Sequence, residues 1–111
     1  MSLSTHVLDS TTGTPAVGVV VRLYRCDGHA DSDLLLAEAA TDADGRIRES
    51  FPPLTAGVHR LMFDTGGYFA LTGVTGFYPH VEIRFTVGDA DSHYHVPLLL
   101  SPFAYATYRG S

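Results

Sequence analysis

The sequence predicts an all-β sandwich or barrel, and three observations indicate this fold class. Eleven glycines and six prolines interrupt the 111-residue chain at short intervals. The segments between them are rich in Val, Thr, Tyr and Phe, which favour strands over helices. About eight such segments follow one another at the roughly 8–12-residue spacing typical of antiparallel sandwiches and barrels. A chain of this length forms one domain, which we place at residues 1–111.

The first half of the chain contains four predicted strands, at 5–9, 19–26, 34–41 and 47–50. In the second of these, Val19, Val21 and Leu23 alternate with residues of the opposite face. The loop at 11–15 contains Gly13, which tolerates a positive φ. The residues DADG at 42–45 form a strong turn signal before the short edge strand.

The second half contains four more predicted strands, at 58–64, 80–87, 94–100 and 103–107. The strand at 80–87 has the clearest alternation, because its odd positions are apolar and its even positions are polar. Ser101 and Pro102 separate the last two strands and leave no room for a helix. Only the segment 67–72 has the length and composition for a helical turn or two.

Charge and composition exclude several classes of protein. Seven basic and twelve acidic residues give a formal net charge of −5, so the chain offers no broad basic surface for nucleic acid. No apolar run approaches the roughly 20 residues of a membrane span. The first residues show no basic segment followed by an apolar one, and we therefore expect a cytoplasmic protein. Cys26 is the single cysteine, and we expect it to be a half-buried strand residue.

Six histidines in so short a chain raise the question of a metal site. His93 and His95 lie two positions apart on a predicted strand, so their rings share a face. With a third histidine such as His6 they could form a three-histidine zinc site with an open position for water. No cluster of Cys, Asp or Glu accompanies the pair, which weighs against this interpretation. The remaining three histidines are expected at the surface or at strand edges, namely His29, His59 and His80.

Four segments resemble, in order, the motifs of the transthyretin-like 5-hydroxyisourate hydrolases. The residues THVLD at 5–9 and GTPA at 13–16 resemble the opening motif, and DGRI at 44–47 resembles the central arginine motif. The residues HYHVPLLLSP at 93–102 resemble the histidine strand, and YRGS at 108–111 matches the terminal tetrapeptide. The four segments span the chain from end to end, and the last two are highly specific.

The resemblance implies a transthyretin-like sandwich of two four-stranded antiparallel sheets with one short helix. It also implies a homotetramer, a dimer of dimers, whose active sites lie in a channel at the interface. The implied reaction is the hydrolysis of 5-hydroxyisourate to 2-oxo-4-hydroxy-4-carboxy-5-ureidoimidazoline in urate degradation. Water attacks a ring carbonyl and a C–N bond breaks, so no redox step occurs and neither a cofactor nor a metal is expected.

The resemblance also implies which residues form the site. The catalytic set is His6, Arg46, His95 and Ser111, and the substrate-binding set is His6, Arg46, Tyr108, Arg109 and Gly110. An imidazole titrates near neutral pH, so His95 is the candidate base, with His6 as its partner or orienting group. A fixed guanidinium can stabilise the negative charge of the tetrahedral intermediate. Ser111 offers a hydroxyl and a terminal carboxylate, and His93 is assigned to the rim or to structure.

Two other functions remain open from sequence. The same sandwich serves in transthyretin as a small-molecule carrier, so the first alternative is a binding protein without catalysis. Such a protein should lack the paired histidines and the YRGS segment, both of which are present here. The second alternative is a zinc hydrolase built on His6, His93 and His95. Metal content and sensitivity to chelators separate it from a metal-free enzyme.

Overall fold

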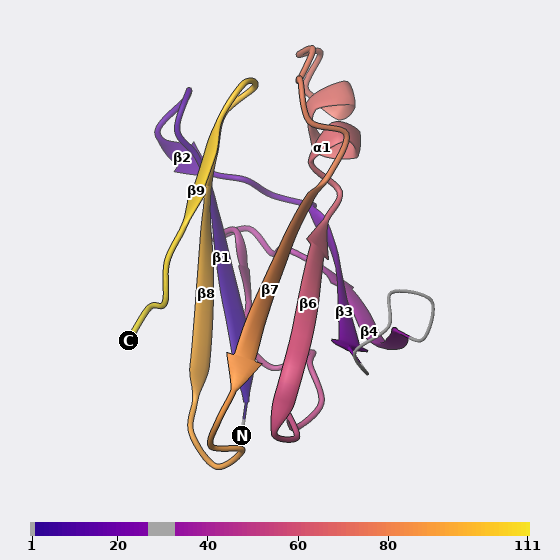
Figure 1. Cartoon of the computed structure of the whole chain (residues 1–111). Coiled ribbons are helices and arrows are strands. Elements are labelled where there is room, and N and C mark those ends of the chain that lie inside the picture. The colour runs from indigo at the N-terminus through magenta and orange to yellow at the C-terminus, as the bar shows by residue number, and fades with distance from the viewer. Residues whose placement is uncertain (1, 27–32) are drawn as a thin grey trace.

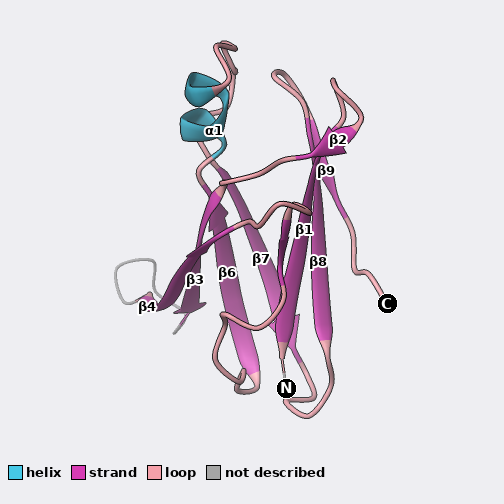
Figure 2. Ribbon diagram, turned by 180° about the vertical axis from the view of Figure 1, so that it is seen from behind, coloured by secondary structure: helices cyan, strands magenta, loops and turns pink. Residues whose placement is uncertain are grey.

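The computed structural model describes residues 2–26 and 33–111, and it confirms the all-β sandwich with one short helix (Figures 1 and 2). Two sheets lie face to face, and the helix α1 (Thr65–Leu71) lies at one end of the sandwich. The described residues contain no helix that is both long enough and apolar enough to cross a membrane. The expectation for His29 falls outside the described residues.

The first sheet has five strands in the order β2-β1-β8-β9, with β5 also paired to β1. Because β8 occupies one edge of β1, the short strands β2 and β5 share its other edge. The strands are β1 (Leu3–Asp9), β2 (Thr14–Pro15), β5 (Arg46–Ile47), β8 (Tyr94–Leu100) and β9 (Tyr105–Thr107).

The second sheet has four strands in the order β4-β3-β6-β7, and all of its neighbours are antiparallel. Its strands are β3 (Val20–Cys26), β4 (Leu34–Ala40), β6 (Gly57–Phe63) and β7 (Val81–Val87). These four lie within one residue of the ranges predicted from alternation. As expected, Cys26 lies half-buried on a strand.

The first sheet differs in detail from the antiparallel sheet that the resemblance implies. Strands β1 and β8 run parallel, from Leu3 beside Tyr94 to Asp9 beside Leu100. The chain enters β8 from β7 of the other sheet, so no tight hairpin forces β8 to be antiparallel to β1. The fifth strand comes from the two-residue strands β2 and β5, the first of which lies inside the predicted loop at 11–15.

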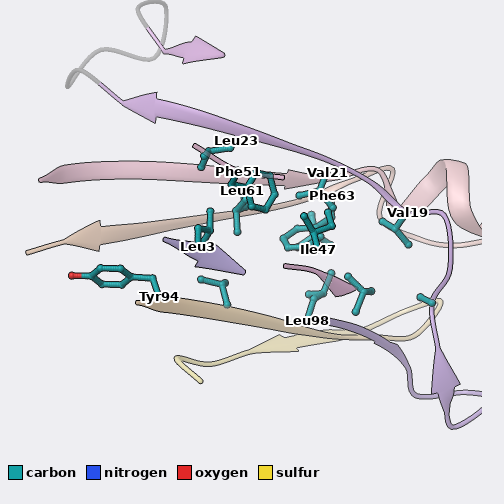
Figure 3. Packing of buried hydrophobic residues seen from close by; sticks show 14 of the residues in the cluster. Leu3, Val19, Val21, Leu23, Ile47, Phe51, Leu61, Phe63, Tyr94 and Leu98 are labelled. Atoms are coloured by element: carbon teal, nitrogen blue, oxygen red, sulfur yellow. The ribbon is translucent and has the colours of Figure 1, made fainter. Parts of the chain in front are cut away.

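The core lies between the two sheets and contains the apolar residues predicted to alternate inward (Figure 3). On β3, Val21 and Leu23 are fully buried, whereas Arg22 between them is not. Each buried Val, Leu or Phe contributes about 1.5–3 kcal/mol relative to an exposed position. The largest fully buried apolar side chains are those of Leu3, Leu23, Leu61, Phe63, Leu98 and Leu100.

The expectation that His59 lies at the surface is wrong, because its side chain is fully buried. On β6 the odd positions face the core, so His59 shares a face with Leu61 and Phe63. Its ring stacks on Phe85 with 6.0 Å between centroids, and its Nδ1 lies 3.3 Å from the Gly57 carbonyl oxygen. In contrast, His80 is exposed and lies 3.2 Å from the carboxylate of Glu82, as expected.

The helix α1 covers the predicted helical turn at 67–72 and begins two residues earlier. Asp64 caps its start, since its Oδ1 accepts a hydrogen bond from the Gly67 amide at 3.0 Å. The buried ring of Phe69 anchors the helix to the sandwich. The chain leaves the helix through Gly73, whose φ of +74° suits glycine.

Candidate active site

The candidate site lies on the outward face of the first sheet and is centred on β1. Burial alternates along this strand, so Leu3, Thr5 and Val7 face the core while Ser4 and His6 face outward. The two neighbouring strands bring further polar residues to this face. His6 lies directly opposite Arg46 of β5, and Ser4 lies level with His95 of β8.

The turn at 42–45 positions Arg46. Asp42 Oδ1 accepts hydrogen bonds from the backbone amides of Asp44 at 2.8 Å and Arg46 at 3.0 Å. Gly45 has a φ of +74°, and its carbonyl accepts a 2.8 Å hydrogen bond from the Val7 amide. A Cβ at Gly45 would lie only 2.5 Å from the Val7 oxygen, so the close approach of this turn to β1 requires glycine. The turn therefore fixes Arg46 beside His6.

His95 is held by a hydroxyl from the neighbouring strand. Ser4 Oγ lies 2.7 Å from His95 Nδ1 and 3.1 Å from His93 Nε2. Ser2 Oγ lies 3.0 Å from His93 Nδ1. Because Nδ1 of His95 is engaged with Ser4, its Nε2 is the nitrogen left for a substrate or a water. Sequence reasoning did not identify Ser2 or Ser4, although they precede His6 by four and two positions, an interval that places alternate strand residues on one face.

The segment after β9 folds back over His95. Gly110 pairs with His95 in an antiparallel bridge, and its amide donates a 2.8 Å hydrogen bond to the His95 carbonyl. Pro97 lacks an N–H and cannot extend the ladder between this bridge and β9, but its carbonyl accepts a 2.6 Å hydrogen bond from the Thr107 hydroxyl. A Cβ at Gly110 would collide with the His95 ring, so glycine alone fits this position.

The other residues of the predicted tetrapeptide lie around this bridge. Arg109 lies over the ring of Tyr94, 4.7 Å from its centroid, and borders a cavity of about 320 Å³ at the open edge of the sandwich. Tyr108 is 60% exposed, and Ser111 follows Gly110 and is also exposed. The structure therefore brings four predicted site residues to one face, and it places the guanidinium of Arg109 over Tyr94 at the edge of that face. Those four are His6, Arg46, His95 and Gly110.

Electrostatics favour the neutral form of both site histidines. Burial lowers the pKa of His6 below its usual value near 6.5, and the positive charge of Arg46 lowers it further. Burial also lowers the pKa of His95, followed by the charges of Arg46, His93 and His6. Both imidazoles are therefore uncharged near neutral pH and able to accept a proton.

The zinc interpretation needs three ligands around one point. Within the described residues, no three His, Cys, Asp or Glu side chains are grouped where they could hold a metal ion. His93 and His95 instead direct ring nitrogens at the hydroxyls of Ser2 and Ser4. The donor set at this face therefore fits a hydrogen-bonded chain of side chains better than a metal centre.

Comparisons with known proteins cover nearly the whole chain. Residues 3–110 match the family model for transthyretin, described as the HIUase/Transthyretin family. The chain is 45% identical over 116 residues to 5-hydroxyisourate hydrolase 2 of Rhizobium meliloti, covering 98% of this chain and 95% of the relative. The structure of Klebsiella pneumoniae 5-hydroxyisourate hydrolase superposes with a TM-score of 0.85 at 44% identity and 98% coverage of both chains. Sea bream transthyretin in complex with thyroxine superposes with a TM-score of 0.87 at 34% identity, over 97% and 93% of the two chains.

Proposed function

The chain belongs to the HIUase/Transthyretin family, and from that premise we propose how it hydrolyses 5-hydroxyisourate to 2-oxo-4-hydroxy-4-carboxy-5-ureidoimidazoline. The observation that carries the proposal is the grouping of His6, Arg46 and His95 on one outward face. These three residues supply two neutral imidazoles and one fixed cation to a planar, polar substrate. The curated hydrolase relatives favour this activity over a carrier without catalysis.

The first step adds water to a ring carbonyl. Nε2 of neutral His95 takes a proton from the water while its oxygen bonds to the carbonyl carbon. The carbonyl oxygen becomes negatively charged, and the guanidinium of Arg46 stabilises that charge. His6, directly opposite Arg46, completes the polar surface on which the ring is oriented.

The second step opens the ring. The C–N bond breaks as the intermediate collapses, and the proton held on His95 passes to the leaving nitrogen. Water is the only co-reactant, and no electrons are transferred, so the atoms balance without a redox group. We propose that Ser111 positions the attacking water and that the Arg109 contact with Tyr94 holds the segment from Tyr108 to Gly110 over the site.

We also propose a cytoplasmic homotetramer arranged as a dimer of dimers. The edge strands β7 and β9 carry unpaired backbone groups that can pair with a second copy. Large exposed rings near these edges favour association, namely those of Phe77, Phe103, Tyr105 and Tyr108. Light scattering should give a mass near four times the 12.0 kDa of one chain, and a monomer would contradict this proposal.

A coupled ultraviolet assay tests the activity. Urate oxidase generates 5-hydroxyisourate in place, and its decay is followed with and without the protein. We expect rapid decay with the intact chain, and decay close to the spontaneous rate with His95→Ala or without Ser111. His80→Ala is the matched control, because His80 is an exposed histidine that lies beside Glu82 of the second sheet. Spontaneous decay with the intact chain would favour a binding protein, and loss of activity on chelation would favour the zinc alternative.

A further inference from the structure

We propose that Ser4 is a positioning residue that joins His95 to His93, and that a proton taken up at the site leaves to solvent through His93. This inference rests on the proposed hydrolysis and adds two residues to it. It assigns a role to His93, which the sequence analysis placed at the rim. It also explains why Ser4 of β1 and Ser2, which directly precedes that strand, lie within hydrogen-bond distance of His95 and His93.

The geometry forms a continuous chain of four side chains. Ser2 Oγ lies 3.0 Å from His93 Nδ1, His93 Nε2 lies 3.1 Å from Ser4 Oγ, and Ser4 Oγ lies 2.7 Å from His95 Nδ1. Strands β1 and β8 lie side by side (Figure 1), and their parallel register places Ser4 level with His95. Each contact lies within hydrogen-bond range for a hydroxyl and a ring nitrogen.

The hydroxyl of Ser4 couples the tautomers of the two rings. It has one proton, so it can donate to one ring nitrogen only and must accept from the other. If His95 Nε2 is free to accept a proton, then Nδ1 carries the hydrogen and donates it to Ser4. Ser4 then donates to His93 Nε2, and His93 Nδ1 donates to Ser2. The chain of contacts is therefore satisfied by the tautomer of His95 that a base requires.

The same chain provides a path for the proton. The first proton taken from water passes from His95 to the leaving nitrogen, and the carboxylic acid formed on ring opening still holds the second proton of that water. When His95 Nε2 takes this second proton, its Nδ1 proton can pass to Ser4 Oγ while the Ser4 proton passes to His93 Nε2. One O–H bond and one N–H bond break, and one of each forms, so Ser4 ends neutral and the positive charge moves from His95 to His93. Because His93 is exposed, it can release a proton to solvent.

The charges around His95 favour this transfer. His6 of β1, Arg46 of β5 and His93, which directly precedes β8, all face it with positive or potentially positive groups. Tyr108 and Arg109 belong to the segment that covers it. The described residues place no carboxylate within ion-pair distance of His95. A proton retained on His95 is therefore repelled by Arg46. His93 lies toward the Ser2 end of β1, away from the position opposite Arg46.

The decisive test compares Ser4→Ala with Ser4→Thr, because threonine keeps the hydroxyl that alanine removes. We expect Ser4→Ala to lower kcat by about 10- to 100-fold with little change in KM. Ser4→Thr should restore most of the loss. The acid limb of the kcat profile should also move in Ser4→Ala, which a purely structural role for Ser4 would not cause. Unchanged kcat and an unchanged pH profile in Ser4→Ala would overturn the proposal and leave the proposed hydrolysis intact.

Two further measurements separate the relay from the hydrolysis. In ¹⁵N spectra of the intact protein, His95 should carry its proton on Nδ1, and Ser4→Ala should mix the tautomers. This result does not depend on turnover, so it tests the contact even if 5-hydroxyisourate is not the substrate.

His93→Phe should slow kcat and remove the curvature of the solvent-isotope dependence that a multi-proton transfer produces. An Nε2 tautomer in the intact protein, or an unchanged isotope dependence in His93→Phe, would overturn the relay. Ser92→Ala is the control, since Ser92 bonds to Asp89.

Discussion

Across residues 2–26 and 33–111, the outward face of the second sheet carries ion pairs, whereas the site cations and imidazoles on the outward face of the first sheet have no carboxylate in an ion pair with them. On the second sheet Arg22 bonds to Glu38 at 2.6 Å, and Arg60 bridges Asp33 and Glu82. Arg84 lies opposite Arg60, and its guanidinium lies 3.6 Å from the same Asp33 carboxylate. These groups compensate one another and stabilise the sheet.

On the first sheet, none of the site cations or imidazoles forms an ion pair within the described part of the chain. His6 and Arg46 lie opposite each other, and His95 is held by the neutral hydroxyl of Ser4. Burial, and after it the positive charge of Arg46, lowers the pKa of both histidines. Positive potential without a partner on the protein is suited to a ligand that brings partial negative charge. The charged groups of the second sheet therefore stabilise the fold, whereas those of the first sheet are available to a ligand.

Removal of Arg46 should have the largest effect, because it takes away the positive charge that the first sheet presents to the substrate. We expect Arg46→Ala to lower kcat by about 10²- to 10³-fold, because a charge aimed at the developing oxyanion is lost. The pKa of His6 and His95 should rise toward 6.5, so the acid limb of kcat/KM should move to higher pH. Arg22→Ala on the second sheet should leave both quantities unchanged. A comparable loss in Arg22→Ala would remove the distinction between the faces.

Gly110→Ala tests whether the fit of the covering segment against His95 matters. The added methyl group would collide with the His95 ring, so the segment or the ring must move. We expect about a 10-fold loss of kcat/KM, since a small misplacement of a reacting group can cost that much or more. The control is Gly88→Ala, because a Cβ at Gly88 meets nothing within 4 Å. Equal activity of the two variants would show that the Gly110 contact does not control the geometry of the site.

Asp33→Asn tests whether the ion pairs of the second sheet contribute to stability and not to activity. The side chain of Asp33 is only 5% exposed, and its Oδ2 accepts a 3.0 Å hydrogen bond from Arg60 Nε. Loss of its charge leaves Arg60 and Arg84 facing each other, so we expect the free energy of unfolding to fall by about 2 kcal/mol. Urea unfolding measures the change, and kcat should stay within error of the wild type. A large loss of activity with unchanged stability would contradict the assignment of this cluster to structure.

His59→Leu should have the smallest effect and should be stabilising. Within the part of the chain that the structure describes, the Nε2 of His59 is buried and has no hydrogen-bond partner. Leucine removes that unsatisfied atom, for a gain of about 1 kcal/mol. Burial lowers the pKa of His59, so below pH 6.5 the unfolded chain binds more protons than the folded chain. Stability therefore falls as the pH drops below 6.5. Urea unfolding at pH 7.5 and 5.5 should show a smaller decrease in His59→Leu, and an equal decrease would exclude His59 as a source of acid sensitivity.

Alternation along the chain predicted most of the fold, but it could not predict how the strands pair. The pattern at 80–87 has one buried face in either strand direction, so it does not distinguish a parallel from an antiparallel neighbour. The expectation for His59 was wrong for a related reason. The range 58–64 predicted a strand, but it did not show that the histidine in this strand faces the core. The two-residue strand β5 has too short a pattern to define its bounds, and it begins one residue before the predicted range at Arg46.

The site was predictable only in part from the residues themselves. The spacing of His93 and His95 places them on one face, and the turn before Arg46 is visible in the sequence. The approach of His6, Arg46 and His95 to one another depends on β1 pairing with β5 and β8, which no local pattern encodes. The assignment of these residues therefore came from the resemblance of the four motifs. Ser4 was missed because a serine on the outward face of a strand is an ordinary solvent-facing residue.

The parallel pairing of β1 with β8 has a consequence for how the protein is made. Ser4 and His95 lie 91 positions apart, so their contact cannot form until β8 has left the ribosome. Contacts this distant in sequence are slow to form, because the long intervening loop must close first. Until then β1 lacks its main neighbour, and its unpaired backbone groups can pair with other nascent chains. Catalytic competence therefore requires that β8 has been synthesised and has paired with β1.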